Sequence, residues 1–399
     1  MKRLFIIVAS IVFLLGIGIG AYFLLRDEPT LTVDENQFGS ADDVPYVPSD
    51  GPGTEGPVQA GEMITEQLVR ITPGPVAIGA VAVALPSQVE GDDPYARGET
   101  EIRYIERASG NVYAYRFHER TLERISNRTL PGVQEAVWLS DGSLAFARFL
   151  SATTDGDERI ETYALPATGE GGHFLDRGLG QVLVSGTTTL MTLLPTTQGS
   201  IATIADIDGT NARTLFSSTL SALTVHLSDG PFIVATKPSV HLDGYAFTVG
   251  AGGSFSRILG PYRGLSVLPS PSGNLVLFTY IESRALRMGL LDRRDGTIES
   301  IPLATLAEKC VWANGEEAIY CGVPKTPSGT LPDDWHQGAV TFSDRLWMVD
   351  LTANVANYLL DISGRVDSPV DMVGLSVDGR NDVLVFKNRA DGSLWAYDI

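Results

Sequence analysis

The sequence predicts an all-β fold, a seven-bladed β-propeller, preceded by one N-terminal transmembrane helix and a disordered linker. The main observation is a series of glycines that recur every 42 to 44 residues, with a last interval of 64: Gly98, Gly142, Gly186, Gly230, Gly273, Gly315 and Gly379. A repeat of roughly 40–45 residues that holds several short strands is typical of propeller blades. Recurring third strands and one displaced fourth strand support the same number of blades.

Residues 1–26 are predicted to anchor the chain in a membrane. Leu4 to Leu25 form an apolar run of 22 residues. At about 1.5 Å per residue, this run spans the roughly 30 Å hydrocarbon core of a bilayer. Basic residues before the run and acidic residues after it place the N-terminus in the cytoplasm and the rest outside. We therefore expect a single-pass protein of the inner (cytoplasmic) membrane with a periplasmic propeller, and a cleaved signal peptide is the alternative. Gly16 and Gly20 have the spacing that allows a weak homodimer through this helix.

Residues 27–61 are predicted to form an extended linker. They contain eight acidic residues, five prolines and no lysine or arginine. Such a segment buries too little apolar surface to fold, and its like charges keep it extended. The linker would hold the domain of residues 62–399 away from the membrane surface.

The strands of residues 62–399 follow from the repeat. Each glycine lies in or beside a tight turn between two apolar segments, as in Thr224–Val234, because glycine readily adopts the positive φ of a hairpin turn. The third strands resemble Val112–Phe117, which Leu394–Ile399 nearly repeats. Leu68–Ile71 has the pattern of a fourth strand but precedes the first repeat. We therefore expect this segment to complete the last blade and close the ring.

Two segments, Asp206–Leu215 and Ser270–Phe278, resemble blades of the TolB-type (WD40-like) propeller family. The resemblance extends over residues 66–399 as short motifs. It implies a binding or scaffolding function in the bacterial envelope. The chain departs from the family's pattern, because the Trp-Asp ending of WD40 repeats is absent and the Tol component has six blades.

The composition and motifs exclude several classes of function. Charged residues make up 19 % of the chain and the formal net charge is -19, so phosphates of nucleic acids and anionic lipids would be repelled. The five histidines have neither H-x-H nor H-E-x-x-H spacing, and no G-x-S-x-G segment occurs. We therefore expect no nucleic-acid partner, no metal, no cofactor and no enzymatic activity. The alternative is a propeller hydrolase or lyase with an active site on the propeller axis.

Cys310 and Cys321 are the only cysteines and flank the turn at Asn314 and Gly315 symmetrically. In such a hairpin they face each other across two strands. Outside the cytoplasm this pair is predicted to form a disulfide, and two buried free thiols are the alternative.

The additional residues of the last interval form an insertion between the second and third strands of the sixth repeat, from about Gly322 to Thr341. In propellers these connections share a rim with the links between blades, and that rim commonly binds ligands. Part of the insertion combines a large ring with polar groups, as interface hot spots do: Asp333, Asp334, Trp335, His336 and Gln337. We therefore expect these residues to bind a protein or cell-wall polymer. In the alternative, Trp335 packs the insertion onto its own blade. A purely structural spacer is the third hypothesis for the chain.

Overall fold

The computed structural model describes residues 58–86, 98–152, 158–250 and 252–399. The chain divides into two compact units, Met1–Gly53 and Thr54–Ile399, and the described residues all belong to the second. The predicted membrane segment, with Gly16 and Gly20, and most of the predicted linker lie outside the described residues. Within the described ranges, no helix has the length and apolar character needed to cross a bilayer.

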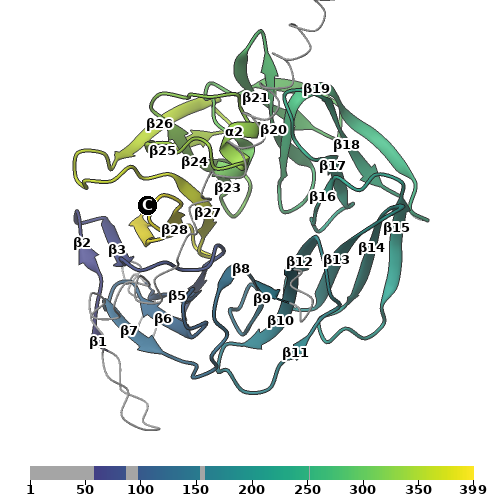
Figure 1. The fold of residues 1–399 in the computed structure, drawn as a ribbon. Helices are drawn as coiled ribbons and strands as arrows, with labels where there is room; N and C mark the ends of the chain where they lie inside the picture. Colours follow the sequence, from purple (N-terminus) through teal and green to yellow (C-terminus); the bar gives the residue numbers. More distant parts are fainter. Residues whose placement is uncertain (1–57, 87–97, 153–157, 251) are drawn as a thin grey trace, which may run out of the picture. The chain divides into compact units, whose positions relative to one another are not determined.

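The second unit is built of antiparallel sheets, and its described helices are each a single turn (Figure 1). The first sheet consists of β4 (Val81–Ala84), β5 (Thr100–Ile105), β6 (Val112–Arg116), β7 (Thr121–Arg124) and β1 (Val58–Gln59). The second consists of β8 (Val133–Trp138), β9 (Leu144–Ala152), β10 (Glu158–Pro166) and β11 (His173–Phe174). The third consists of β12 (Gln181–Ser185), β13 (Thr189–Thr196), β14 (Gly199–Asp206) and β15 (Arg213–Ser218).

The fourth sheet has seven strands: β16 (Leu223–His226), β17 (Ile233–Thr236), β18 (Asp243–Val249), β19 (Phe255–Pro269), β20 (Leu275–Glu282), β21 (Ala285–Asp292) and β22 (Ile298–Ser300). The fifth consists of β23 (Cys310–Trp312), β24 (Ala318–Pro324), β25 (Asp344–Asp350) and β26 (Val355–Asp361). The sixth consists of β27 (Met372–Val377), β28 (Val383–Asn388), β29 (Leu394–Asp398), β3 (Leu68–Thr72) and β2 (Glu62–Met63). The single-turn helices are η2 (Ala307–Lys309) and α2 (Asp333–His336).

The sheets follow one another in a closed cycle. β5 contacts β8, β8 contacts β12, and β12 contacts β16. η2 contacts β19, β20 and β24, while β23 contacts β27, and β27 returns to β4. Buried apolar clusters lie between neighbouring sheets, as where Val69 and Val385 of the sixth sheet pack with Ile102 of the first. This arrangement is that of a β-propeller.

The repeat glycines are found where the sequence predicts them. All seven lie in the connections between the first and second strands of successive four-stranded runs: β4–β5, β8–β9, β12–β13, β16–β17, β19–β20, β23–β24 and β27–β28. Gly142 and Gly273 have φ of 69° and 71°, the left-handed conformation that favours glycine. The fourth sheet holds two such runs because β19 pairs with β18 through its first half and with β20 through its second half.

The predicted closure is confirmed. β3 pairs antiparallel with β29, so that Val69 lies opposite Ala396 and Leu68 opposite Tyr397. The domain also begins earlier than residue 62, because Val58–Gln59 adds to the first sheet beside β7. A strand from each end of the described chain therefore shares the sixth sheet.

Cys310 and Cys321 lie directly opposite each other on β23 and β24 and form a disulfide. Both residues are buried in the apolar cluster that also contains Trp312 and Val349. The bond therefore joins two strands that already pair, and it closes a short loop.

We expect replacement of both cysteines by serine to lower the free energy of unfolding by about 3 kcal/mol, the amount expected for a short closed loop. The sequence separation of the pair is 11 residues. Urea unfolding of the wild-type and double-variant proteins measures the difference. A wild-type midpoint that does not change on addition of a reductant, together with two titratable thiols, would mean that the bond is not formed.

Candidate functional site

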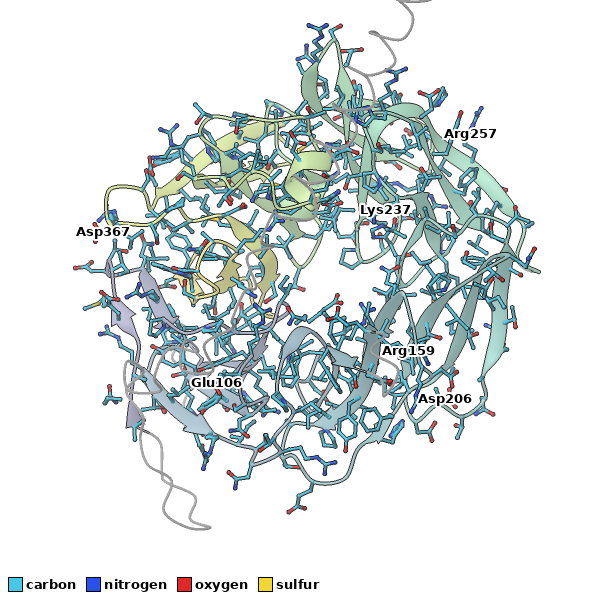
Figure 2. All side chains as sticks on the ribbon, viewed as in Figure 1. Glu106, Arg159, Asp206, Lys237, Arg257 and Asp367 are labelled. Carbon is cyan, nitrogen blue, oxygen red and sulfur yellow. A yellow bond between two sulfur atoms is a disulfide. The ribbon has the colours of Figure 1, made fainter. Side chains whose placement is uncertain are left out.

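One face of the domain gathers the connections that carry the candidate site. Connections alternate between the two edges of an antiparallel sheet, so those from the second to the third strand lie opposite the glycine turns. They include β17–β18, β20–β21 and the predicted insertion, β24–β25, and they share their face with the links β22–β23 and β26–β27. We call this side the insertion face. Lys237, on the β17–β18 connection, lies on the inner side of the sheets, whereas Arg257 and Asp367 lie at the outside (Figure 2).

Trp335 packs the insertion onto the domain. Its side chain is only 7 % exposed and forms a buried cluster with Leu306, Leu331, Phe342 and Val373. Its indole Nε1 donates a hydrogen bond to a carboxylate oxygen of Asp371 at 3.1 Å. The ring is therefore buried, as in the alternative interpretation, but Val373 and Asp371 belong to β27 and the link before it and not to the insertion's own sheet.

The other predicted binding residues also make contacts within the chain. Asp333 accepts hydrogen bonds from the Ser239 hydroxyl and the Val240 backbone N–H, both at 2.8 Å. Burial favours the protonated carboxyl, but these hydrogen bonds outweigh it and the pKa of Asp333 is lowered. Asp334 accepts from the Thr330 backbone N–H at 2.6 Å, while Gln337 is exposed. A role of the segment in binding a partner stays a prediction.

A second feature, which the sequence did not indicate, is a buried cluster of Lys309, Asp344 and Asp371, here called the buried lysine cluster. All three side chains are 0 % exposed. The Lys309 Nζ lies 2.8 Å from Asp344 Oδ2 and also contacts Asp371 Oδ1. The cluster joins the links β22–β23 and β26–β27 to the start of β25. It holds the base of the insertion in place.

Asp344 has an unusual environment within this cluster. Burial raises its pKa to about 6, although the charge of Lys309 and the hydrogen bond from it act in the opposite direction. Its Oδ2 accepts from the Met372 backbone N–H at 2.7 Å, but its buried Oδ1 has no hydrogen-bond partner. Oδ1 is therefore the atom on which Asp344 would take up a proton, and with a pKa of about 6 it does so at a higher pH than an ordinary carboxyl group.

The exposed part of the face holds an imidazole–carboxylate pair, Glu308 and His336. His336 Nε2 lies 2.7 Å from Glu308 Oε2, and the side chains are 25 % and 34 % exposed for His336 and Glu308 respectively. The other Glu308 oxygen accepts a hydrogen bond from the Ser266 hydroxyl at 3.0 Å. His226 on β16 has its pKa lowered to about 4 by burial, which the charge of Glu308 opposes only partly. Three different elements, η2, α2 and β19, therefore bring Glu308, His336 and Ser266 together here.

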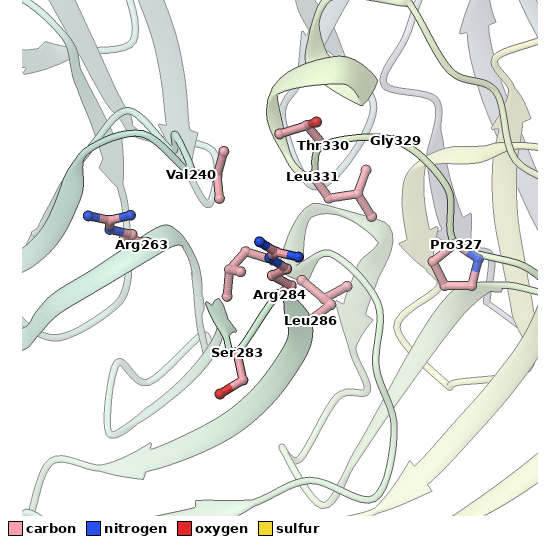
Figure 3. A pocket seen from close by; sticks show the side chains of 10 residues that line it. Val240, Arg263, Ser283, Arg284, Leu286, Pro327, Gly329, Thr330 and Leu331 are labelled. Atoms are coloured by element: carbon pink, nitrogen blue, oxygen red, sulfur yellow. The ribbon is translucent and has the colours of Figure 1, made fainter.

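Beside α2 lies a cavity of about 560 Å³ (Figure 3). It is lined by the connections β17–β18 and β20–β21, by the insertion and by β21, through residues that include Val240, Leu331 and, on β21, Leu286. Arg263 and Arg284 supply its cationic groups, and Arg263 lies 3.8 Å from the carboxylate of Asp243. Guanidinium groups hydrogen-bond carboxylates and phosphates through paired N–H donors. The cavity therefore fits a ligand that combines an apolar part with an anionic group.

Within the described ranges, no three His, Cys, Asp or Glu side chains are placed to hold a metal ion together.

Comparison with known proteins places the fold but not a family. The sequence matches no family model and no curated protein. An oligogalacturonate lyase in complex with manganese has a similar structure, with a TM-score of 0.54 and 8 % identity over 87 % of this chain and 97 % of that one. A puromycin hydrolase S511A mutant is similar with a TM-score of 0.51 and 14 % sequence identity, over 78 % of this chain and 50 % of that one. TolB from Acinetobacter baumannii is less similar, with a TM-score of 0.43 and 10 % sequence identity over 69 % of this chain and 78 % of that one.

These similarities correct one expectation and refine another. The expectation that the chain is not an enzyme, which rested on the absence of catalytic sequence motifs, is wrong, because a lyase and a hydrolase share this propeller fold. The missing sequence motifs therefore do not exclude catalysis, since residues from separate sheets can meet on one face. The predicted β-propeller fold agrees with the similarity to the lyase and the hydrolase, and membership of the TolB-type family stays a prediction.

Proposed function

We propose that this chain is a membrane-anchored, extracytoplasmic seven-bladed propeller enzyme, a hydrolase or lyase that acts on an anionic polymer or protein of the cell envelope. The blade number follows if the seven-stranded sheet is counted as two blades that share β19. The anchor is supported by the apolar run Leu4 to Leu25. The observation that carries the proposed activity is the hydrogen bond between Glu308 and His336 on the insertion face.

In this proposal His336 is the general base or acid. Glu308 orients the ring through Nε2 and stabilises its protonated form, and it is itself held by Ser266. The Nδ1 of His336 makes no hydrogen bond to the described part of the chain, so it is the atom that exchanges a proton with substrate. Arg263 and Arg284 would bind an anionic group of the substrate in the cavity beside α2.

The test is a substrate screen with the detergent-solubilised full chain. Envelope polysaccharides, peptidoglycan and unfolded proteins are incubated with the chain, and new reducing ends, unsaturated products and peptide fragments are measured. We expect Glu308→Gln and His336→Asn to lower turnover by about 10²–10⁴-fold, the usual contribution of a general acid or base. His173→Asn is the matched control, because His173 is an exposed histidine on β11, away from the insertion face.

Two results would contradict the proposal. Turnover that both variants retain would exclude the Glu308–His336 pair as the catalytic group. Specific binding of a polymer or protein with no product from any substrate would instead support a scaffold. In that case Arg284→Ala would locate the binding site.

A further inference from the structure

The buried lysine cluster has the arrangement required for a covalent bond between side chains. Lys309 contributes a primary amine, and its Nζ contacts the Oδ1 of Asp371, whose carboxyl carbon is one bond further away. Asp344 approaches the same Nζ from another element, at 2.8 Å. We propose that Lys309 and Asp371 form an intramolecular isopeptide bond in the folded protein, with Asp344 carrying the proton. This inference does not depend on the proposed enzymatic function.

The charges of the cluster favour a product with fewer buried charges. One ammonium and two carboxylates leave one net negative charge in a site with no exposed side chain. An unbalanced buried charge is costly, so the cluster takes up a proton. The raised pKa of Asp344 and its unpartnered Oδ1 indicate where that proton resides. Replacing the ammonium and carboxylate of Lys309 and Asp371 by a neutral amide removes two more buried charges.

Besides the two carboxylates and the Met372 carbonyl oxygen, two aromatic rings border Lys309. The Nζ lies 5.1 Å from the ring centre of Trp335 and 5.6 Å from that of Phe342. Both rings belong to the insertion, which closes this side of the cluster. Burial beside these rings keeps bulk water away from a newly formed amide.

Asp371 is held in a fixed orientation for attack. Its Oδ2 accepts hydrogen bonds from Trp335 Nε1 at 3.1 Å and from the Phe342 backbone N–H at 3.2 Å. These donors stabilise the negative charge that develops on oxygen when the amine adds to the carbonyl carbon. Holding the amine and the carboxyl group in contact replaces a bimolecular reaction by an intramolecular one, which gives a large increase in rate.

The reaction balances without an oxidant or other reactant. A proton first passes from the Lys309 ammonium to the Asp371 carboxylate; the amine nitrogen then attacks the carbonyl carbon of Asp371, and a C–N bond forms. Asp344 accepts a proton from the nitrogen and gives one to the departing hydroxyl oxygen. The C–O bond of Asp371 breaks, one water molecule leaves, and Asp344 returns to its initial state. The product joins the β22–β23 link to the β26–β27 link, 62 residues apart in sequence.

The first test is the mass of the purified full-length protein after reduction and alkylation. We expect a tryptic product in which Asp295–Lys325 is joined to Val366–Arg380, because trypsin does not cleave after a lysine whose amine is an amide. Its mass would equal the two peptides minus one water. Recovery of a peptide that ends at Lys309, together with full recovery of free Val366–Arg380, would overturn the proposal whatever the variants do.

Variants test the roles of the residues. Asp371→Asn is expected to form the same bond with loss of ammonia in place of water, whereas Lys309→Arg and Asp344→Ala are expected to remain unlinked. Lys325→Arg is the control, because Lys325 forms its own ion pair with Asp361 in the same sheet and should leave the link intact. A linked Asp344→Ala protein would exclude Asp344 as the proton carrier.

Discussion

Replacing Lys309 by methionine is expected to lower the free energy of unfolding by about 3–5 kcal/mol, because Asp344 and Asp371 would then be buried without the lysine nitrogen, which they contact as an ammonium before the proposed bond forms and as an amide after it. Asp344 and Asp371 would both lose their contact with Nζ, and the Met372 carbonyl oxygen would lose the 3.0 Å hydrogen bond from it. Urea unfolding at neutral pH, followed by tryptophan fluorescence, measures the change.

Lys325→Met is the matched control for this prediction. Lys325 pairs with Asp361 at 2.8 Å in the same sheet, but both side chains are 25 % exposed. A solvent-screened pair of this kind contributes about 0–1 kcal/mol. If the two substitutions lower the free energy of unfolding equally, burial of Lys309 does not increase the contribution of its contacts to stability.

Replacing Trp335 by alanine is expected to cost about 3–5 kcal/mol, as for other buried tryptophans. The substitution opens a cavity between Leu331, Phe342 and Val373 and removes the indole donor from Asp371. The insertion should then become more susceptible to limited proteolysis, with cleavage between Lys325 and Arg345. Both effects can be measured on the same preparation.

Trp335→Phe separates the two contributions of this side chain. It retains most of the apolar ring but removes the hydrogen bond to Asp371, for which a loss of about 1–3 kcal/mol is expected because a buried acceptor loses its donor.

One result would contradict the structural role of Trp335. If Trp335→Ala unfolds like the wild type but no longer captures a partner from solubilised membranes, the ring belongs to a binding surface, as first expected.

The repetitive parts of the fold were predictable because they are local. Gly142 and Gly273 mark hairpin turns through their backbone conformation, and flanking apolar runs mark the strands. The cysteine pair followed from symmetry about one turn, and the β3–β29 pairing followed from a fourth strand in an unexpected place. The sequence around β19 did not indicate that this strand belongs to two four-stranded runs. That arrangement depends on its pairing with β18 in its first half and with β20 in its second.

The candidate site was predictable only in position. The insertion was found from the length of one interval, but the buried state of Trp335 depends on Leu306 and Val373, which lie on other elements. Lys309 and Asp371 are separated by 62 residues, and single charged residues next to strands are common. The Glu308–His336 pair likewise forms only when α2 folds over η2. The composition of the chain and the spacing of its residues do not indicate contacts between side chains that are so far apart in sequence.

The pairing of β3 with β29 also determines the order in which the domain can form during synthesis. Leu68–Thr72 leaves the ribosome early, yet its partner Leu394–Asp398 is made more than three hundred residues later. Until then the edge of β3 stays without this neighbour and the apolar face of the last sheet is incomplete. The ring therefore closes only after nearly the whole domain has been synthesised, and the early strand must be kept from pairing elsewhere in the meantime.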